Sequence, residues 1–385
     1  MLVYKRGAAE LIGLLHDIGK YSEAFQERIR GKKISAPHAM AGASILSDKY
    51  GLFGKHYGLV VASHHTGLSD YGTNSDMDNN TYCGKLNNYK SKSLPYEDEL
   101  TLPIKIEPPK IKLPNKDWAF HFATYLRMLF SILVDSDFTD TEEFCTGINR
   151  VTRSFDAVKL FELLMAKMPK NTGGKVNDIR AGILKNCLTM ADKPQGLFSL
   201  TVPTGGGKTL SSLAFALEHA RVHKLRRVIY VIPYTSIIEQ NAAVFIQTLG
   251  KDNVFEHHSG VDINDEDDED SDDLRIKRLK WASEDWNVPI IVTTNVQFFE
   301  SLFAVKTTRV RKIHNIANSV VIFDEAQMLP PDYLTPCMWA ISELIVNYGV
   351  TAVLCSATQP FVQKFAYESL KTTEIADNPD LRVAK

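Results

Sequence analysis

The stretch PTGGGKT, at residues 203–209, has the residue types that bind a phosphate. Its glycines let consecutive backbone N–H groups turn toward one anion, and the helical pattern that follows adds the positive end of a helix dipole. Lys208 can then reach the β- and γ-phosphates of a nucleotide, while Thr209 holds Mg²⁺. An ATP site is therefore predicted at Thr204, Gly205, Gly206, Gly207, Lys208 and Thr209.

An acidic pair, Asp324 and Glu325, follows the apolar run at residues 320–323. A carboxylate at the end of a strand that faces a phosphate loop can hold the Mg²⁺ shell, and its neighbour can orient and deprotonate the attacking water. We therefore assign Asp324 to the metal ion and Glu325 to the catalytic base. Together with the phosphate loop, this pair predicts ATP hydrolysis.

Histidines and acids that suit metal ions gather in the first half of the chain. Imidazole and carboxylate together ligate transition metals such as Mn, Fe, Co or Ni, and two such ions a few ångströms apart form a two-metal hydrolytic site. Six of the chain's histidines lie in this half, and four of them lie beside small residues or acids at predicted helix ends. The other two, His56 and His121, are expected to be ordinary hydrogen-bonded residues.

Apolar spacing predicts the elements that position these residues. The first half has a helical period and is expected to be all-helical, with helices that include residues 39–49 and 118–134 and another that begins near Tyr57. In the second half, apolar runs alternate with helical stretches, which indicates a parallel sheet with functional residues at the carboxyl ends of its strands. The predicted strands are 197–202, 228–232, 290–293, 320–323 and 352–354.

Hydroxyl and amide side chains follow two more of the predicted strands. Such groups at helix N-termini suit the backbone phosphates of a single nucleic-acid strand and read no bases. Taken alone, each is also an ordinary helix N-cap. The candidates are Thr235 and Ser236 after one strand, and Thr293, Thr294, Asn295 and Gln297 after another.

The length of 385 residues exceeds the size at which single cores stop growing, so two domains are expected. The best boundary is the Pro-, Gly- and charge-rich stretch 169–176, which leaves domains at 1–168 and 177–385. The net charge of -2 argues against nucleic-acid binding by bulk positive charge. Five well separated cysteines fit a reducing compartment, and no apolar run is long enough to span a bilayer, so we expect a cytoplasmic protein with no membrane partner.

The histidine and acid motifs follow the order of the HD superfamily of metal-dependent phosphohydrolases. Four stretches resemble the HD nuclease domain of the helicase-nuclease of type I CRISPR interference: LLHDIGKYSEAFQ, PHAMAGA, SHHTGL and LVDSDFTDTE. The resemblance implies that Asp17 and Lys20 take part in catalysis, with Lys20 close to the substrate phosphate, and it favours Asp137 over Asp135. It also implies two divalent transition metals, such as Mn²⁺, Co²⁺, Ni²⁺ or Fe²⁺, held by His16, Asp17, His38, His64, His65 and Asp137.

The run 197–360 resembles the first RecA-like lobe of the same helicase-nuclease, and it is most similar to subtype I-C members in YVIPYTSIIEQNAAVF, IIVTTNVQFFESLFA, SVVIFDEAQMLPPDYL and VLCSATQP. The resemblance implies a multidomain chain, with an all-α HD domain followed by an α/β RecA-like lobe. Ser356 and Thr358 would couple the ATP site to the DNA site. The implied activity of the full-length protein is ATP-driven 3′ to 5′ movement on the displaced single-stranded DNA, which the HD site cuts after an RNA-guided type I surveillance complex recruits the protein.

Two departures from the family pattern bear on the activity of this chain. The family has a further metal-ligating histidine upstream of His16, whereas residues 1–15 contain none, so one ion of the pair would lose a ligand. The sequence also stops soon after Thr358, before the second RecA-like lobe that supplies arginine fingers. We therefore expect an N-terminal portion that binds nucleotide weakly and does not turn it over at a useful rate.

Two other functions fit the same motifs. One is an HD nucleotide phosphohydrolase whose RecA-like lobe only senses ATP. The other is a non-catalytic fragment that the surveillance complex or an inhibitor protein recognises. Turnover of free nucleotides would favour the first, and binding without either activity would favour the second.

Two polar stretches complete the chain. The insertion at 72–116 carries lysines. These lysines either contact DNA or a partner protein, or belong to a loop that is simply solvated. The acidic loop at 262–273 is either a solvated loop or a means of repelling DNA.

Overall fold

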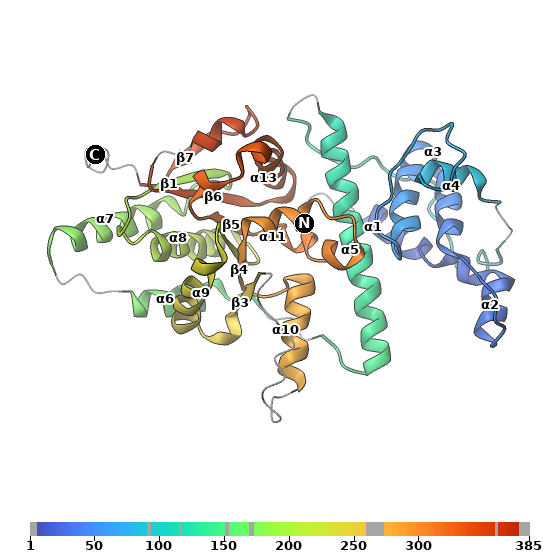
Figure 1. Cartoon of the computed structure of the whole chain (residues 1–385), viewed down its shortest axis with the longest axis horizontal. Coiled ribbons are helices and arrows are strands. Elements are labelled where there is room, and N and C mark those ends of the chain that lie inside the picture. The colour runs from blue at the N-terminus through green and yellow to red at the C-terminus, as the bar shows by residue number, and fades with distance from the viewer. Residues whose placement is uncertain are drawn as a thin grey trace. The chain divides into compact units, whose positions relative to one another are not determined.

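The computed structural model describes residues 6–90, 94–114, 117–150, 154–168, 173–258, 273–358 and 361–376. These residues form two compact units, whose elements are labelled in Figure 1. Unit 1 is the described part of residues 1–113, 117–149 and 303–314, and unit 2 is the described part of 114–116, 150–302 and 315–385. The predicted acidic loop at 262–273 lies outside the described residues, apart from the backbone of Asp273.

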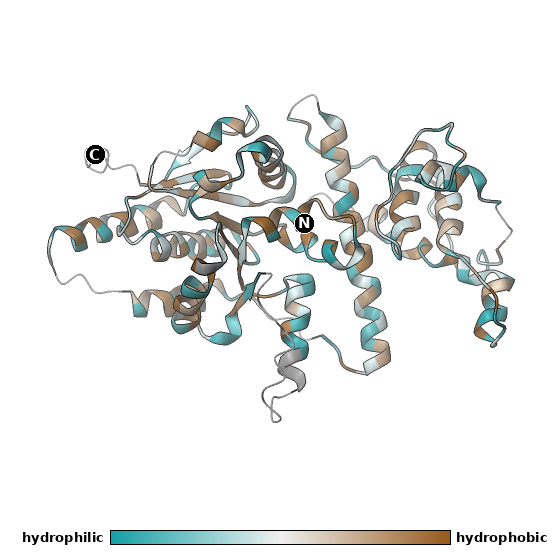
Figure 2. Cartoon of the chain, viewed as in Figure 1, coloured by the Kyte–Doolittle hydropathy of each residue, from teal (hydrophilic) through white to brown (hydrophobic). Residues whose placement is uncertain are grey.

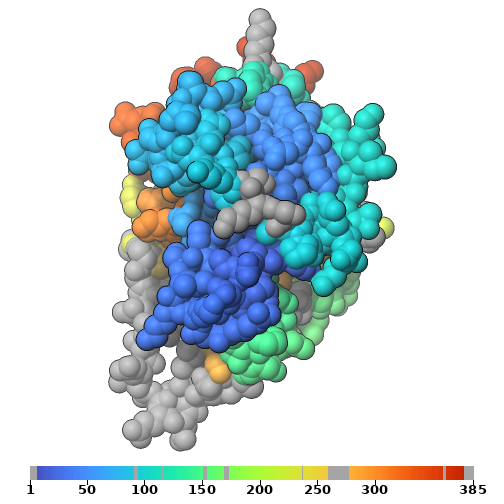
Figure 3. All heavy atoms as spheres, turned by 90° about the vertical axis from the view of Figure 1, so that its right-hand side faces the viewer, coloured from blue at the N-terminus to red at the C-terminus, as the bar shows by residue number. Residues whose placement is uncertain are grey.

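Unit 1 is all-helical in its described residues, as predicted. Its helices are α1 (Arg6–Leu15), α2 (Glu23–Ile29), α3 (Ala39–Ser63), α4 (Tyr82–Asn88), α5 (Trp118–Thr146) and α12 (Thr307–Val310), together with the 3-10 helix η1 (Ile18–Tyr21). Leu11, Ile12 and Leu15 form the apolar face of α1, which packs against α3 and α5. Figure 3 shows the face of unit 1 that α2, α3, α4 and the residues between them form, in blue to cyan.

The helix α3 contains a kink at Gly51, where φ is +57°. A positive φ interrupts the helical hydrogen-bond pattern and is readily adopted by glycine. The two halves of α3 therefore correspond to the two helices that the sequence predicted there.

Two glycines allow a close backbone approach at the end of α1. Gly42 on α3 faces the carbonyl oxygen of Leu15, and a Cβ at this position would clash with that oxygen. Gly19 in η1 faces the backbone of His38 equally closely. The residues that follow α1 are therefore held beside the residue that precedes α3.

A parallel sheet forms the centre of unit 2, with the order β3-β4-β2-β5-β6-β1-β7 in the described residues. Its strands are β1 (Leu197–Thr201), β2 (Val228–Ile232), β3 (Val254–His257), β4 (Ile290–Thr294), β5 (Val320–Phe323), β6 (Thr351–Ser356) and β7 (Thr372–Glu374). Every residue of β2, β4, β5 and β6 is buried, and Figure 2 shows hydrophobic residues in brown along the sheet. The predicted α/β lobe with a parallel sheet is thus confirmed.

Helices precede the first strand of unit 2 and connect most of the later strands. They are α6 (Ala157–Lys167), α7 (Lys175–Met190), α8 (Lys208–His223), α9 (Thr235–Leu249), α10 (Asp273–Asp285), α11 (Asn295–Leu302) and α13 (Leu334–Tyr348). The remaining described 3-10 helices are η2 (Lys251–Asn253), η4 (Ala326–Met328), η5 (Pro331–Tyr333) and η6 (Phe361–Phe365) in unit 2, and η3 (Ile313–Ile316), which begins in unit 1 and ends in unit 2. Among the described helices of both units, none combines the length and the apolar character that crossing a bilayer requires.

The compact units divide at a different place from the predicted domains. The division falls between Asn149 and Arg150, upstream of the predicted linker at 169–176. The reason is that α6 packs on α8 and α9, with Leu160 and Leu164 in the core of unit 2. Residues 303–314 also belong to unit 1, although the chain reaches them between α11 and β5.

We expect Gly42→Ala to destabilise unit 1, because the new Cβ would meet the Leu15 carbonyl oxygen. Overpacking of this kind costs about 1–3 kcal/mol. The matched control is Gly13→Ala on α1, where a Cβ meets nothing within 4 Å and where alanine favours the helix. Chemical denaturation measures both variants, and equal stability of the two would contradict this account of the α1–α3 contact.

Candidate metal centre and nucleotide site

All of the predicted metal ligands converge in unit 1. They come from the residues after α1, the two ends of α3 and the second half of α5. Ligand atoms of Asp17, His38, His64 and His65 lie within 4.8 Å of one another, and so do those of His16, Asp17 and Asp137. We call these residues the His-Asp cluster: His16, Asp17, His38, His64, His65 and Asp137.

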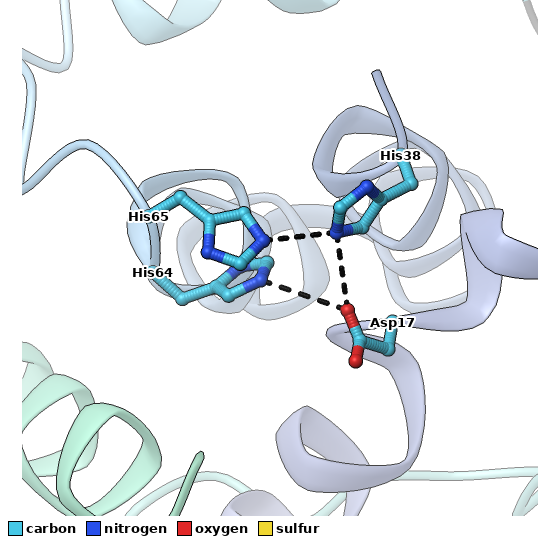
Figure 4. Close-up of side chains that lie close together, drawn as sticks. All are labelled: Asp17, His38, His64 and His65. Atoms are coloured by element: carbon cyan, nitrogen blue, oxygen red, sulfur yellow. Dashed lines mark hydrogen bonds and ion pairs between the residues drawn. The ribbon is translucent and has the colours of Figure 1, made fainter. Parts of the chain in front are cut away.

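Figure 4 shows the first group of the cluster, in which three imidazole rings and one carboxylate lie close together. The Oδ1 atom of Asp17 is 3.2 Å from His38 Nε2 and 3.8 Å from His64 Nε2. The Nε2 atoms of His38 and His65 are 2.9 Å apart. Imidazole nitrogens and a carboxylate oxygen around one point are a ligand set for a divalent transition metal.

The second group shares Asp17 with the first. His16 Nε2 lies 3.3 Å from Asp17 Oδ2 and 3.7 Å from Asp137 Oδ1. Asp17 thus turns one oxygen toward each group. A shared carboxylate between two adjoining ligand groups suits a pair of ions a few ångströms apart.

Backbone carbonyls fix the orientation of two of the imidazole rings. His64 Nδ1 lies 2.6 Å from the Val61 carbonyl oxygen, and His16 Nδ1 lies 2.7 Å from that of Gly13. A carbonyl only accepts, so Nδ1 carries the proton and Nε2 faces the cluster, which is the arrangement of a metal-ligating histidine. His64 Nε2 and Asp17 Oδ1 are also buried without a hydrogen-bond partner in the described residues, and such atoms fit a bound cation.

The charges of the cluster balance one another. Burial opposes protonation of His16, but its hydrogen bonds to Asp137 and Asp17 raise the pKa of His16 to about 10. Burial also opposes the charged form of Asp17, but its cationic neighbours hold the pKa of that carboxyl well below its usual range. Burial lowers the pKa of His64 to about 4, so this imidazole is neutral at pH 7, as a metal ligand must be.

Lys20 and Asp135 occupy different positions relative to the cluster. The Lys20 ammonium pairs with Asp17, and 43% of the side chain is exposed, so it can also reach an anion from solvent. Asp135 instead accepts a hydrogen bond from Arg311 Nε at 2.9 Å. Of the two acids that the sequence offered on α5, Asp137 is the one in the cluster.

In unit 2, the residues predicted to bind ATP meet at the carboxyl ends of β1 and β5. Gly205 and Gly207 have φ values of +83° and +80°, which glycine adopts freely. Lys208 begins α8, and its ammonium lies 3.1 Å from Asp324 Oδ1 and also pairs with Glu325. These acids outweigh burial and raise the pKa of Lys208. Thr204 and Gly206 lie in the same loop, and Thr209 lies in the first turn of α8.

The backbone of Glu325 is strained, because its φ of +47° lies in the left-handed region that favours glycine. Burial disfavours its carboxylate, but Lys208 and Gln327 outweigh burial and lower the pKa of Glu325. Burial raises the pKa of the neighbouring Asp324. Strain of this kind is concentrated at functional sites.

A hydrogen-bonded chain leads from Glu325 to the predicted coupling residues. Gln327 Nε2 donates to Glu325 Oε2 at 2.6 Å, and Ser356 Oγ donates to Gln327 Oε1 at 2.8 Å. The Thr358 N–H in turn donates to Ser356 Oγ at 3.2 Å. Gln327 is absent from the predicted site, although its place two residues after Glu325 is a signal for this role.

Two further residues at the nucleotide site carried no sequence signal. Arg180 on α7 donates from Nε and Nη2 to the Gly205 carbonyl oxygen, at 3.0 and 2.8 Å. Glu374 on β7 accepts hydrogen bonds from the Thr201 N–H at 3.0 Å and from its hydroxyl at 2.8 Å. Arg180 thus orients the phosphate loop, and Glu374 fixes the end of the strand that carries it.

The residues predicted to contact DNA differ in exposure. Thr235 is exposed at the start of α9, beside Tyr234, of which 49% is exposed. Thr293 is fully buried, and its hydroxyl donates to the His257 carbonyl oxygen at 2.8 Å, which ties β4 to β3. The side chain of Ser236 lies outside the described part of the chain.

The candidates around the start of α11 form a helix cap. The Thr294 hydroxyl accepts a hydrogen bond from the Gln297 N–H at 3.0 Å. Asn295 is 6% exposed, and its Oδ1 has no hydrogen-bond partner in the described residues. Gln297 Nε2 donates to Ser301 at 3.4 Å. Their roles in DNA contact stay predictions.

Comparison with known proteins relates both sites to one class of protein. The model of the HD domain family matches residues 4–102, and that of the DEAD/DEAH box helicase family matches residues 183–365. A CRISPR-associated nuclease/helicase Cas3 from Haloferax volcanii is 28% identical over 195 residues, which are 46% of this chain and 20% of the relative. The chain is similar to Cas3.

Solved structures support the same fold. The crystal structure of T. fusca Cas3-ADP is 15% identical, has a TM-score of 0.59 and covers 91% of this chain. A chain of the CRISPR RNA-guided surveillance complex, pre-nicking, is 16% identical, has a TM-score of 0.51 and covers 93% of this chain. The matches account for 44% and 42% of those chains, so this chain spans less than half the length of either of them.

We expect Arg180→Gln to weaken nucleotide binding about 10-fold, because a charge-assisted hydrogen bond contributes about 1.5–3 kcal/mol and 1.4 kcal/mol is a factor of ten. Arg221→Gln on α8 is the matched control, since the Arg221 guanidinium is exposed and pairs with Glu218. Isothermal titration with Mg²⁺-ADP measures both variants. An unchanged Kd for Arg180→Gln would remove this residue from the nucleotide site.

Proposed function

We propose that this chain supplies the nuclease site and the first motor lobe of a type I CRISPR helicase-nuclease that acts on single-stranded DNA. The observation that carries the proposal is the convergence of the His-Asp cluster in a chain that also pairs Lys208 with Asp324. The similarity to Cas3 supports this combination of sites. The four helicase-like stretches of the sequence favour subtype I-C.

In the proposed nuclease reaction, the chain's own residues position the scissile phosphate. Divalent ions at the cluster, such as Mn²⁺, Co²⁺, Ni²⁺ or Fe²⁺, supply Lewis-acid stabilisation of the charge that develops during hydrolysis. Asp17 serves both ligand groups, and Asp137 holds His16 in place. Lys20 neutralises the phosphate through its exposed ammonium.

In the proposed motor reaction, Lys208 binds the nucleotide phosphates, while Thr209 and Asp324 hold Mg²⁺. Glu325 orients the attacking water. Gln327 hydrogen-bonds both Glu325 and Ser356, so a movement of the Glu325 carboxylate would be transmitted to Ser356. We propose that turnover by the whole protein also uses arginines of a second RecA-like lobe, as superfamily 2 motors do.

The exposure of Tyr234 supports the proposed substrate, and the similarity to a solved chain supports the proposed partner. The exposed ring of Tyr234 beside Thr235 suits stacking on a base of a single strand, which needs no sequence preference. One similar solved chain belongs to a CRISPR RNA-guided surveillance complex, and this supports such a complex as the partner that delivers the displaced DNA strand.

We expect His64→Ala to reduce Mn²⁺-dependent cleavage of single-stranded DNA by at least about 100-fold, since even residues that only support a metal ligand contribute 10- to 100-fold. His56→Ala on α3 is the control, because His56 lies outside the cluster and bonds the Leu52 carbonyl oxygen. Cleavage of a labelled oligonucleotide is measured for both folded variants. Cleavage that survives His64→Ala would contradict the proposal, and turnover of free nucleotides in place of DNA would favour a nucleotide phosphohydrolase.

A further inference from the structure

A segment from the second half of the sequence forms part of unit 1. Residues 303–314 follow α11 and precede β5, which are both elements of unit 2, yet they pack within the helical unit. We call residues 303–314 the clasp. The family match to the HD domain ends at residue 102, so nothing in that match includes the clasp.

The first contact of the clasp is with the turn after α3. The Leu68 N–H donates to the Val305 carbonyl oxygen at 2.9 Å. Gly67 has a φ of +93°, and a Cβ there would lie 2.6 Å from the same oxygen. Gly67 and Leu68 follow His64 and His65 closely in the chain, so the clasp restrains the chain next to two of the cluster's imidazoles.

The second contact is with α5. The buried hydroxyl of Ser131 lies 2.7 Å from the Val310 carbonyl oxygen and accepts a hydrogen bond from the His314 N–H at 3.2 Å. The buried Arg311 donates from Nε to Asp135 Oδ1 at 2.9 Å. Its guanidinium also lies over the Phe138 ring, 5.2 Å from the centroid.

The helical period explains why this contact bears on the metal centre. Ser131 and Asp135 are four residues apart, so they share one face of α5. Asp137 follows Asp135 by two residues, which is about 200° of rotation in a helix with 3.6 residues per turn. The clasp therefore holds one face of α5, while the opposite face presents Asp137 to the cluster.

Two of the points at which the chain passes from unit 1 into unit 2, after residues 149 and 314, are anchored at the same part of unit 2. Arg150, the first residue after the helical unit, pairs with Glu284 at 2.9 Å and with Asp285 at 3.4 Å. Asn315, the first residue after the clasp, donates to the Asp285 carbonyl oxygen at 2.8 Å. Both crossings of the chain are therefore anchored at the end of α10.

We propose that the clasp is a positioning element of the metal centre. It fixes the turn after His64 and His65 and the helix that carries Asp137, and it follows directly after α11, whose first residues are DNA-contact candidates. The metal affinity of the helical unit thus depends on residues that the helicase half of the sequence supplies. This inference rests on the proposed function only for its link to DNA cleavage.

The test uses the full chain and the variant Arg311→Gln, with Ser131→Ala as a second lesion in the same contact. We expect about a 10-fold loss of Mn²⁺ affinity by isothermal titration for each, the low end of what residues that position metal ligands contribute. Cleavage of single-stranded DNA should fall with it, whereas the Kd for Mg²⁺-ADP should stay unchanged, and Arg311→Lys should restore part of the loss.

Arg309→Gln is the matched control, because Arg309 is an exposed arginine of the same segment. Mn²⁺ affinity within 2-fold of the wild type in both folded variants would overturn the inference, as would an equal loss of ADP affinity, which would indicate general destabilisation. A wild-type chain that binds Mn²⁺ without cutting DNA would contradict the proposed nuclease activity. The Mn²⁺ affinities of the variants and the wild type would still decide the role of the clasp. A wild-type chain that binds no Mn²⁺ would contradict both the proposed nuclease activity and the role of the clasp.

Discussion

The carboxylate of Asp17 is the interaction on which the candidate metal centre depends. One of its oxygens faces His38 and His64, the other faces His16, and Lys20 pairs with the same group. Asp17 reaches this place because α1 ends beside α3. The two backbones can approach there because Gly42 has no Cβ, which would clash with the Leu15 carbonyl oxygen. The packing of two helices thus decides whether the ligands meet.

At the nucleotide site too, the packing of the backbone brings the functional residues together, here through a parallel sheet. Parallel strands bring the phosphate loop after β1 and the acids after β5 to one edge of the sheet. At both sites a protein cation balances partly or fully buried acids, His16 in unit 1 and Lys208 in unit 2. A divalent ion, or Mg²⁺ with a nucleotide, can take over that balance without leaving the acids unpaired.

Apolar periodicity predicted the two classes of fold and the inner strands, and the family resemblance implied the set of residues that meets around Asp17. The periodicity did not predict β3 or β7, since edge strands are short and less apolar than buried ones, as Thr372–Glu374 illustrates. Nor did it predict the position of residues 303–314 or the burial of Thr293, because long-range packing decides both. Arg180 was missed for a related reason, since an exposed arginine on a helix has no periodic or motif signal.

Anomalous diffraction from crystals grown with Mn²⁺ tests the central claim most directly. The account predicts manganese within coordination distance of Asp17, His38, His64 and His65, with Asp17 also ligating any second ion beside His16 and Asp137. Manganese bound only near Lys208 and Asp324, with none at Asp17, would contradict it.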